Sequence, residues 1–283
     1  RTIDSSISDG IWSTQPDDGD RVVKSYAENL YFYESCFSYD MKNWNRISGT
    51  TVSSPFYFDG HVLSSSGQSY FDPTVSTVRS TADLYEKQPV VPAGIATTPA
   101  YWGPAAGEKE GRTAFSIARN NSDGTDRLLM LRKDQIDDAD WGWEVVALPG
   151  GEVPLQILCT EGDDPRFWVF TGQKVYVSSV LTPTTFQSYD LPVNALWDLA
   201  CHDGKSFTIV STTGDVSAFS SDGFTWHLSN NFQNFDDSNI RLAGTNGRTI
   251  YGVDFGISDP VTDPDTNSII SYWVTEYLRS GVG

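Results

Sequence analysis

The chain has 283 residues, of which 39% are hydrophobic and 13% aromatic, and this composition excludes an intrinsically disordered chain and predicts a packed core. Its 19 Lys and Arg residues against 37 Asp and Glu give a net charge of -18, which would repel phosphate backbones and anionic lipid. Neither nucleic acid nor a membrane is therefore an expected partner. The sequence contains no run of 18 apolar residues, so no transmembrane helix is predicted. Closed all-β architectures reach this length as one unit, so we expect a single domain over residues 1–283.

Short runs of Val, Ile, Thr, Tyr, Phe and Trp alternate with Gly, Asp, Asn, Ser and Pro along the chain, which predicts an all-β fold. In chain order, a first unit ends near residue 44, and a weakly marked unit follows around residues 55–65 and the segment near Leu84. The clearest strand and turn signals occur at 154–191 and again at 195–228, each as a four-stranded meander. Two adjacent units of similar plan indicate a repeat.

An aromatic residue opens the expected fourth strand of most units. These markers are Trp44, Trp143, Phe186 and Trp226, with Trp273 in the last unit. Subtraction gives intervals of 43, 40 and 47 residues after Trp143, and 99 residues, about two units, before it.

A four-stranded sheet of this size has two apolar faces and must stack on other copies, and radial stacking makes a β-propeller. Six four-stranded blades fit the length, and five or seven stay open. Only five residues follow the last strand signal at 269–278. We therefore expect residues 2–5 to supply the missing strand and to close the ring from the N-terminus.

Residues 220–226 read Ser-Ser-Asp-Gly-Phe-Thr-Trp and predict a tight hairpin turn. The Asp accepts backbone N–H groups, the Gly permits a positive φ, the Ser caps the turn, and the Trp packs between strands. The structural residues are thus Ser220, Asp222, Gly223, Thr225 and Trp226. A second copy at 38–44, with Ser38, Asp40 and Trp44, lacks the Gly and the Thr.

These turns resemble the Asp-box of sialidase-type (BNR) β-propellers in a degenerate form, and the second copy looks like turns of viral and phage surface propellers. In that family the box joins the third and fourth strands, on the face opposite the ligand site. The resemblance implies that loops joining second to third strands, and loops joining successive units, share the ligand face. Those loops are 118–127, 212–214, 230–237 and 257–268.

Candidate ligand-binding residues follow from this face and from the chemistry of recognition. Trp102, in the irregular stretch PAYWGPAAG, is expected to offer an exposed aromatic platform for a sugar ring or an interface. Polar and charged side chains of the acidic loops complete the set, namely Arg119, Asn120, Asp123, Asn231 and Asp236.

Alternating oxygen ligands at Asp263, Asp265 and Asn267 suit Ca²⁺, with a solvated acidic loop as the alternative. Asp123 and Asp126 offer a second, looser group. No other cofactor is expected, because the chain has no GxGxxG, P-loop or GxSxG stretch.

The sequence favours a non-catalytic recognition module that binds a glycan or a surface protein, either extracellular or on a virion such as a phage tail or capsid. Two alternatives stay open. One is a glycoside hydrolase with paired carboxylates, for which Asp59, Asp72, Asp198 and Asp254 lie at strand-like positions. The other is a structural protein of a larger assembly. Cys36, Cys159 and Cys201 are expected to be buried thiols, with one disulfide left open.

Overall fold

The computed structural model describes residues 23–24, 31–33, 36–38, 45–48, 52, 54–64, 66–160, 164–193, 195–202, 206–211, 216–229, 240–245 and 248–253. These residues fall into two compact units that divide after Val193. The expected strand at residues 2–5 and the last strand signal at 269–278 lie outside the described residues, so the closure of the ring stays a prediction, as does the single domain.

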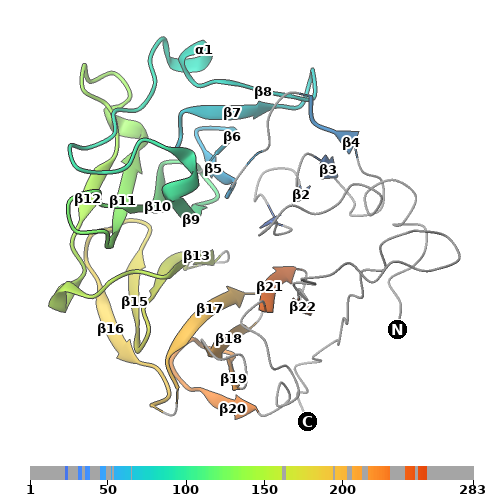
Figure 1. The fold of residues 1–283 in the computed structure, drawn as a ribbon, viewed down its shortest axis with the longest axis vertical. Coiled ribbons are helices and arrows are strands. Elements are labelled where there is room, and N and C mark those ends of the chain that lie inside the picture. Colours follow the sequence, from blue (N-terminus) through green and yellow to red (C-terminus); the bar gives the residue numbers. More distant parts are fainter. Residues whose placement is uncertain are drawn as a thin grey trace, which may run out of the picture. The chain divides into compact units, whose positions relative to one another are not determined.

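The unit that ends at Val193 contains four antiparallel meanders, in which each strand pairs with its neighbours in sequence (Figure 1). The first sheet has β1 (Val23–Lys24), β2 (Tyr31–Tyr33), β3 (Cys36–Ser38) and β4 (Asn45–Arg46), and the second has β5 (Phe56–Phe58), β6 (His61–Leu63), β7 (Ser69–Asp72) and β8 (Thr77–Ser80). The third has β9 (Trp102–Gly107), β10 (Thr113–Arg119), β11 (Asp126–Arg132) and β12 (Glu144–Val146), and the fourth has β13 (Gln156–Thr160), β14 (Arg166–Phe170), β15 (Lys174–Ser179) and β16 (Gln187–Asp190). The short helices are α1 (Ala82–Tyr85), η2 (Pro99–Tyr101), η3 (Lys133–Gln135) and η4 (Pro149–Gly151).

The second unit contains the sheet of β17 (Trp197–His202), β18 (Phe207–Ser211), β19 (Ser217–Ser220) and β20 (His227–Ser229), and the hairpin of β21 (Ile240–Thr245) and β22 (Arg248–Val253). Across the described ranges this makes five four-stranded sheets and one two-stranded sheet. The prediction of an all-β chain built from four-stranded meanders is confirmed.

The aromatic markers that the structure describes stand where the sequence predicted them, and Trp44 and Trp273 lie outside the described residues. Trp143, Phe186 and Trp226 each directly precede a fourth strand, β12, β16 and β20, and β4 begins one residue after Trp44. The weakly marked unit is the sheet β5–β8, and the segment near Leu84, which the sequence grouped with this unit, follows β8 as a short helix. It forms α1, because the backbone N–H groups of Leu84 and Tyr85 both donate to the Thr81 carbonyl at 3.0 Å.

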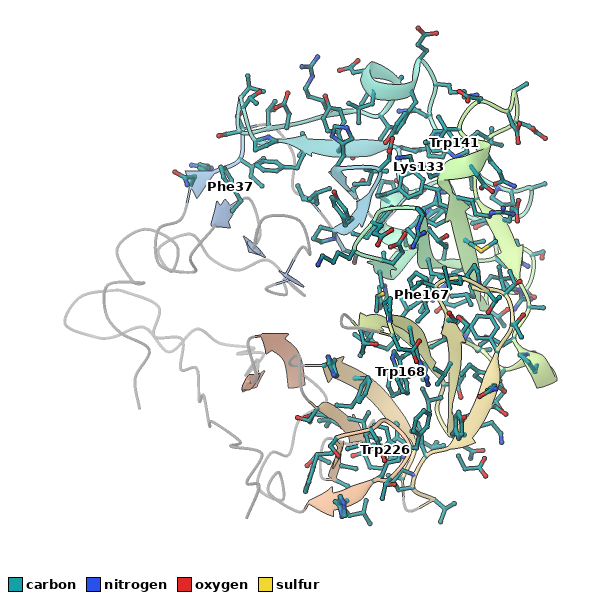
Figure 2. All side chains as sticks on the ribbon, turned by 180° about the vertical axis from the view of Figure 1, so that it is seen from behind. Phe37, Lys133, Trp141, Phe167, Trp168 and Trp226 are labelled. Atoms are coloured by element: carbon teal, nitrogen blue, oxygen red, sulfur yellow. The ribbon has the colours of Figure 1, made fainter. Side chains whose placement is uncertain are left out.

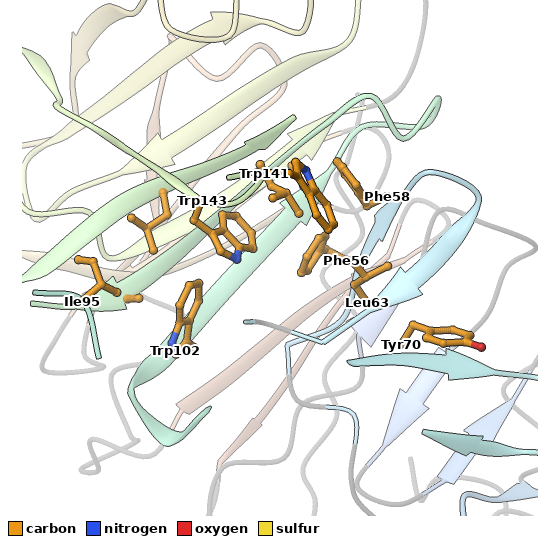
Figure 3. Close-up of a cluster of buried hydrophobic side chains, with 12 residues drawn as sticks. Phe56, Phe58, Leu63, Tyr70, Ile95, Trp102, Trp141 and Trp143 are labelled. Atoms are coloured by element: carbon orange, nitrogen blue, oxygen red, sulfur yellow. The ribbon is translucent and has the colours of Figure 1, made fainter. Parts of the chain in front are cut away.

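Both faces of the third sheet are buried, and β10 shows the reason. Alternate residues of a strand point to opposite faces, so Ala114 and Ala118 join one apolar cluster while Phe115 and Ile117 join another. The first cluster includes aromatic side chains from the second and third sheets (Figure 3), and the other includes side chains from the fourth sheet. Full burial of a side chain such as Phe115 or Ile117 stabilises the fold by about 1.5–3 kcal/mol. A sheet with both faces in water would lose this stabilisation on each face. Cys159 is buried in the second cluster, as predicted.

The innermost strands of the second and third sheets touch through a glycine. A Cβ atom at Gly107 of β9 would lie 1.8 Å from the carbonyl oxygen of Tyr57 in β5. No side chain fits this gap, so Gly107 sets how closely the two sheets approach. Gly103, in the same strand, has only ordinary contacts, the nearest at 3.7 Å from the Ile117 carbonyl oxygen.

The turn between β19 and β20 has the hydrogen bonds predicted for residues 220–226. Oδ1 of Asp222 accepts the N–H groups of Phe224 and Thr225 at 2.8 and 2.7 Å, and Oγ of Ser220 accepts the N–H of Gly223 at 2.8 Å. Gly223 has a φ of 78°, which favours glycine. The turn therefore connects third and fourth strands, as predicted. Trp226, labelled in Figure 2, is partly buried, with its ring 6.4 Å from that of Phe207.

Donation from the Thr225 N–H is the main cause that lowers the pKa of Asp222 from 3.8 to about 2. In the degenerate copy, Ser38 is the last residue of β3, whereas Asp40 and Trp44 lie outside the described residues.

We expect Gly107→Ala to lower the free energy of unfolding by about 1–3 kcal/mol or more, because the new methyl group must push β9 away from β5. Gly103→Ala is the matched control, and we expect it to change stability by less than about 1 kcal/mol. Urea titration of both variants measures the difference. Equal effects would contradict the close approach of the two strands.

We expect the contribution of Asp222 to stability to depend on pH. Its pKa is depressed in the folded state, so the contribution is complete above the unfolded value near pH 4 and is lost as the pH falls from about 4 through 2. At pH 6, Asp222→Ala should cost about 1 kcal/mol, a figure kept small because solvent screens this exposed carboxylate. Urea titrations at pH 6 and pH 3 should show that cost shrinking. Asp222→Asn, which keeps an acceptor oxygen that does not titrate, should show no such trend.

Candidate functional site

The loop that joins β10 and β11 is held in one compact shape by its own backbone. The N–H of Asn120 donates to the Thr125 carbonyl at 2.8 Å, and the N–H of Gly124 donates to the Asn120 carbonyl at 2.9 Å. This loop joins second and third strands, as predicted for 118–127, so it lies at the opposite end of the strands from a turn of the Asp-box type.

A second segment, residues 92–101, runs beside this loop. The N–H of Ala96 donates to the Arg119 carbonyl at 2.9 Å, and the N–H of Asn121 donates to the Gly94 carbonyl at 2.8 Å. These bonds join residues more than 20 positions apart in the sequence into one surface. We call this surface, made of residues 92–101 and 119–127, the loop platform.

One aromatic side chain is exposed on the loop platform. Tyr101, at the end of η2, is 49% exposed. The guanidinium of Arg119 lies 5.6 Å from the centre of its ring, within the range of a cation–π interaction. Asp126 holds the other side of that guanidinium, with Oδ1 3.6 Å from Nε. The platform thus presents an aromatic ring beside an oriented hydrogen-bond donor.

The two other predicted ligand residues of this loop shape the turn. Oδ1 of Asn120 accepts the N–H of Ser122 at 2.9 Å and its hydroxyl at 2.7 Å. Oδ1 of Asp123 accepts the N–H and the hydroxyl of Thr125 at 2.9 and 2.7 Å, and its other oxygen pairs with Arg127. These bonds, first of all the one from the Thr125 N–H, lower the pKa of Asp123. Both residues therefore act first as local supports of the loop.

The prediction that Trp102 is an exposed platform is wrong. Its side chain is 5% exposed, its indole N–H donates to the Ala96 carbonyl at 2.8 Å, and its ring lies 5.3 Å from that of Trp143 (Figure 3). Because Trp102 is the first residue of β9 and Tyr101 ends the preceding turn, the two side chains point in different directions. The exposed aromatic residue of this stretch is Tyr101.

The carboxylates of the loop platform, considered from the sequence as a looser group for Ca²⁺, are engaged in ion pairs. Asp126 and Asp123 are each paired with an arginine, and in the part of the chain that the structure describes no three His, Cys, Asp or Glu side chains gather in a metal-binding group. Ca²⁺ ordinarily takes six to eight oxygen ligands. The metal candidates Asp263, Asp265 and Asn267 lie outside the described residues, as do the ligand candidates Asn231 and Asp236.

Two of the four carboxylates considered for glycoside hydrolysis form ion pairs, and Asp254 lies outside the described residues. Asp59 pairs with Lys133 at 2.5 Å, and Asp72 pairs with Arg79 at 3.4 Å. No described helix is long and apolar enough to cross a bilayer.

No family model and no curated protein sequence matches the chain. Solved structures do share its fold. Virginiamycin B lyase from Staphylococcus aureus superimposes with a TM-score of 0.52 at 11% identity, over 84% of this chain and 78% of that chain. A streptogramin B lyase structure superimposes with a TM-score of 0.51 at 13% identity, over 84% of this chain and 77% of that chain. At these identities the likeness concerns the fold alone. Together with the four-stranded sheets, it establishes the chain as an all-β propeller, and the number of six blades stays a prediction.

We expect two neighbouring aromatic residues to respond in opposite ways to truncation. Trp102→Ala should lower the free energy of unfolding by about 3–5 kcal/mol, because it empties a buried site and removes a buried hydrogen bond. Tyr101→Ala should change it by less than about 0.5 kcal/mol, because half of the ring faces solvent. Denaturant titration followed by tryptophan fluorescence, with circular dichroism for the Trp variant, measures both. A large loss in Tyr101→Ala would contradict the exposed platform.

Proposed function

We propose that this propeller is a non-catalytic recognition module that binds a glycan at the loop platform. The observation that carries the proposal is the exposed ring of Tyr101 beside the guanidinium of Arg119. Aromatic faces stack on the apolar faces of sugar rings, and an adjacent planar donor can bond the ring hydroxyls or a carboxylate.

Preorganisation of the loop platform supports this role. Backbone bonds at Ala96 and Asn121, and the buried anchor of Trp102, fix the segments that carry Tyr101 and Arg119. A ligand that meets a surface already ordered avoids most of the entropic cost of ordering it. Binding sites of this kind lie on loops held by a rigid scaffold.

Recognition is favoured over hydrolysis by the state of the carboxylates. Hydrolysis of a glycosidic bond needs two carboxyl groups facing each other across the substrate. Asp59 and Asp72 instead neutralise cations at strand ends. The paired arginines of the loop platform likewise leave no free carboxylate beside Tyr101 among the described residues.

The setting that we propose is extracellular or on a virion surface. The Asp-box-like turn at 220–226, the degenerate turn at 38–44 and the net charge of -18 support it. A protein ligand is the second candidate, because exposed Tyr and Arg side chains are also the common anchors of protein interfaces.

We expect the purified chain to bind a defined set of glycans on a printed array, and Tyr101→Ala to weaken the strongest of these at least about tenfold in calorimetry. Arg119→Gln should weaken it by a similar factor. Phe224→Ala, which removes an exposed aromatic from the β19–β20 turn, is the matched control and should bind like the parent.

Array binding that survives both platform substitutions would move the site elsewhere. An array without any bound glycan would overturn the glycan ligand, and cross-linking through a photoreactive residue in place of Tyr101 would then test the protein alternative.

A further inference from the structure

A groove of about 800 Å³ opens at the other end of the third sheet. Its walls come from Arg112 and Thr113 at the start of β10, from Arg132 to Asp134 after the end of β11, and from residues 180–185 between β15 and β16. Since β10 and β11 are antiparallel, the start of β10 and the end of β11 lie together, at the opposite end from Arg119 and Asp126 of the loop platform. We call this hollow the basic groove.

The charge of the basic groove is opposite to that of the chain. Arg112, Arg132 and Lys133 line it against a single acidic residue, Asp134, whereas the whole chain carries 37 acidic and 19 basic residues. The three basic side chains are each between a third and a half exposed to solvent. The lining of this groove is therefore basic in a chain that is acidic as a whole.

Each of these cations has an acidic partner, one of which, Asp134, itself lines the groove. Asp134 pairs with Arg132, and Asp59 accepts from Lys133 at 2.5 Å, a bond that raises the pKa of Lys133 and keeps it charged. Arg112 pairs with Glu110 at 3.1 Å and more loosely with Glu108 at 3.4 Å.

The carboxylate of Glu108 mainly accepts hydrogen bonds from the backbone. Its carboxylate is 3% exposed and accepts the backbone N–H groups of Glu110 and Arg112 at 2.7 and 2.5 Å.

These ion pairs leave donors for a ligand. A guanidinium has five N–H donors and an ammonium has three, and Arg132 gives only Nη2 to its partner within the described residues. Solvent-exposed pairs are worth about 0–1 kcal/mol each, so a ligand carboxylate can displace or share them at little cost. A bidentate contact to one arginine would be stronger than the pair it replaces.

The remaining lining is aliphatic and hydroxylic. Leu181 is 75% exposed, and the turn fixes it there, since its N–H donates to Ser179 Oγ at 3.2 Å and the next N–H, of Thr182, donates to the Ser179 carbonyl at 3.1 Å. Met130 and Val180 add buried apolar surface at the base. Among the described residues, no aromatic side chain lines the groove, so this lining lacks the stacking surface that sugar rings prefer.

We propose that the basic groove is a second binding site, and that its occupant is an acidic peptide segment of a partner protein with aliphatic side chains. The cations fit Asp and Glu, the aliphatic lining fits Leu, Ile or Val, and the threonine hydroxyls of 182–185 fit a peptide backbone. The volume lies within the range of about 300–1,000 Å³ found for specific ligand sites, enough for a few residues of extended chain. This site is independent of the glycan ligand proposed for the loop platform.

The test uses a fluorescein-labelled library of hexapeptides made of Asp, Glu, Leu and Val, together with a matched library in which Asn and Gln replace the acids. Fluorescence anisotropy with the full chain should select acidic members, and added salt should weaken their binding. Arg132→Gln and Leu181→Ser should each raise the Kd of the selected peptide at least about tenfold. Arg79→Gln is the matched control, because Arg79 is a similarly exposed, ion-paired arginine outside the groove, and it should bind like the parent. Thermal melting of each variant verifies that it is folded.

Three results would overturn the proposal. They are equal binding of the acidic and the amide libraries, no binding of either, and an equal loss in Arg132→Gln and Arg79→Gln. A uronic-acid oligosaccharide that displaces the selected peptide and binds more tightly would overturn the peptide as occupant. Tyr101→Ala should leave peptide binding unchanged, so failure here and failure of the glycan proposal are separate outcomes.

Discussion

The backbone of β9 approaches that of β5 closely at Gly107. The packing of the second sheet against the third depends on this contact. Because no Cβ atom intervenes, the Tyr57 carbonyl lies where a side chain would otherwise stand. Near this contact, Phe56 and Phe58 of β5 meet Trp141 and Trp143, which lie in the segment between β11 and β12. A four-stranded sheet with two apolar faces is not stable in water, so burial of both faces decides whether each sheet persists.

The described strands of the third sheet carry different loops at their two ends. Strands β10 and β11 carry the loop platform at one end and the basic groove at the other. Seven consecutive residue pairs join these two strands, so both ends are fixed to one rigid element. Sites placed in this way can differ in chemistry without disturbing the core.

Charged side chains are distributed unevenly between the chain as a whole and these two strand ends. The chain carries a net charge of -18, yet the loop platform pairs its acids with Arg119 and Arg127, and the basic groove concentrates three cations. An acidic surface elsewhere limits nonspecific association. The two local exceptions are the places where a partner finds oriented donors beside apolar surface.

Features that depend only on neighbouring residues could be predicted from the sequence. The turn at 220–226 could be predicted because all of its hydrogen bonds lie within six residues, and Trp143, Phe186 and Trp226 marked fourth strands because each follows a local turn. Tertiary structure alone decided the rest. Trp102 is buried because its indole N–H bonds to the Ala96 carbonyl and its ring packs against that of Trp143. With Trp102 buried, the neighbouring Tyr101 is the exposed ring of this segment. The basic groove was not predicted because its walls, at 112–134 and 180–185, are about 50 residues apart in sequence and meet only when the third and fourth sheets pack on their shared core.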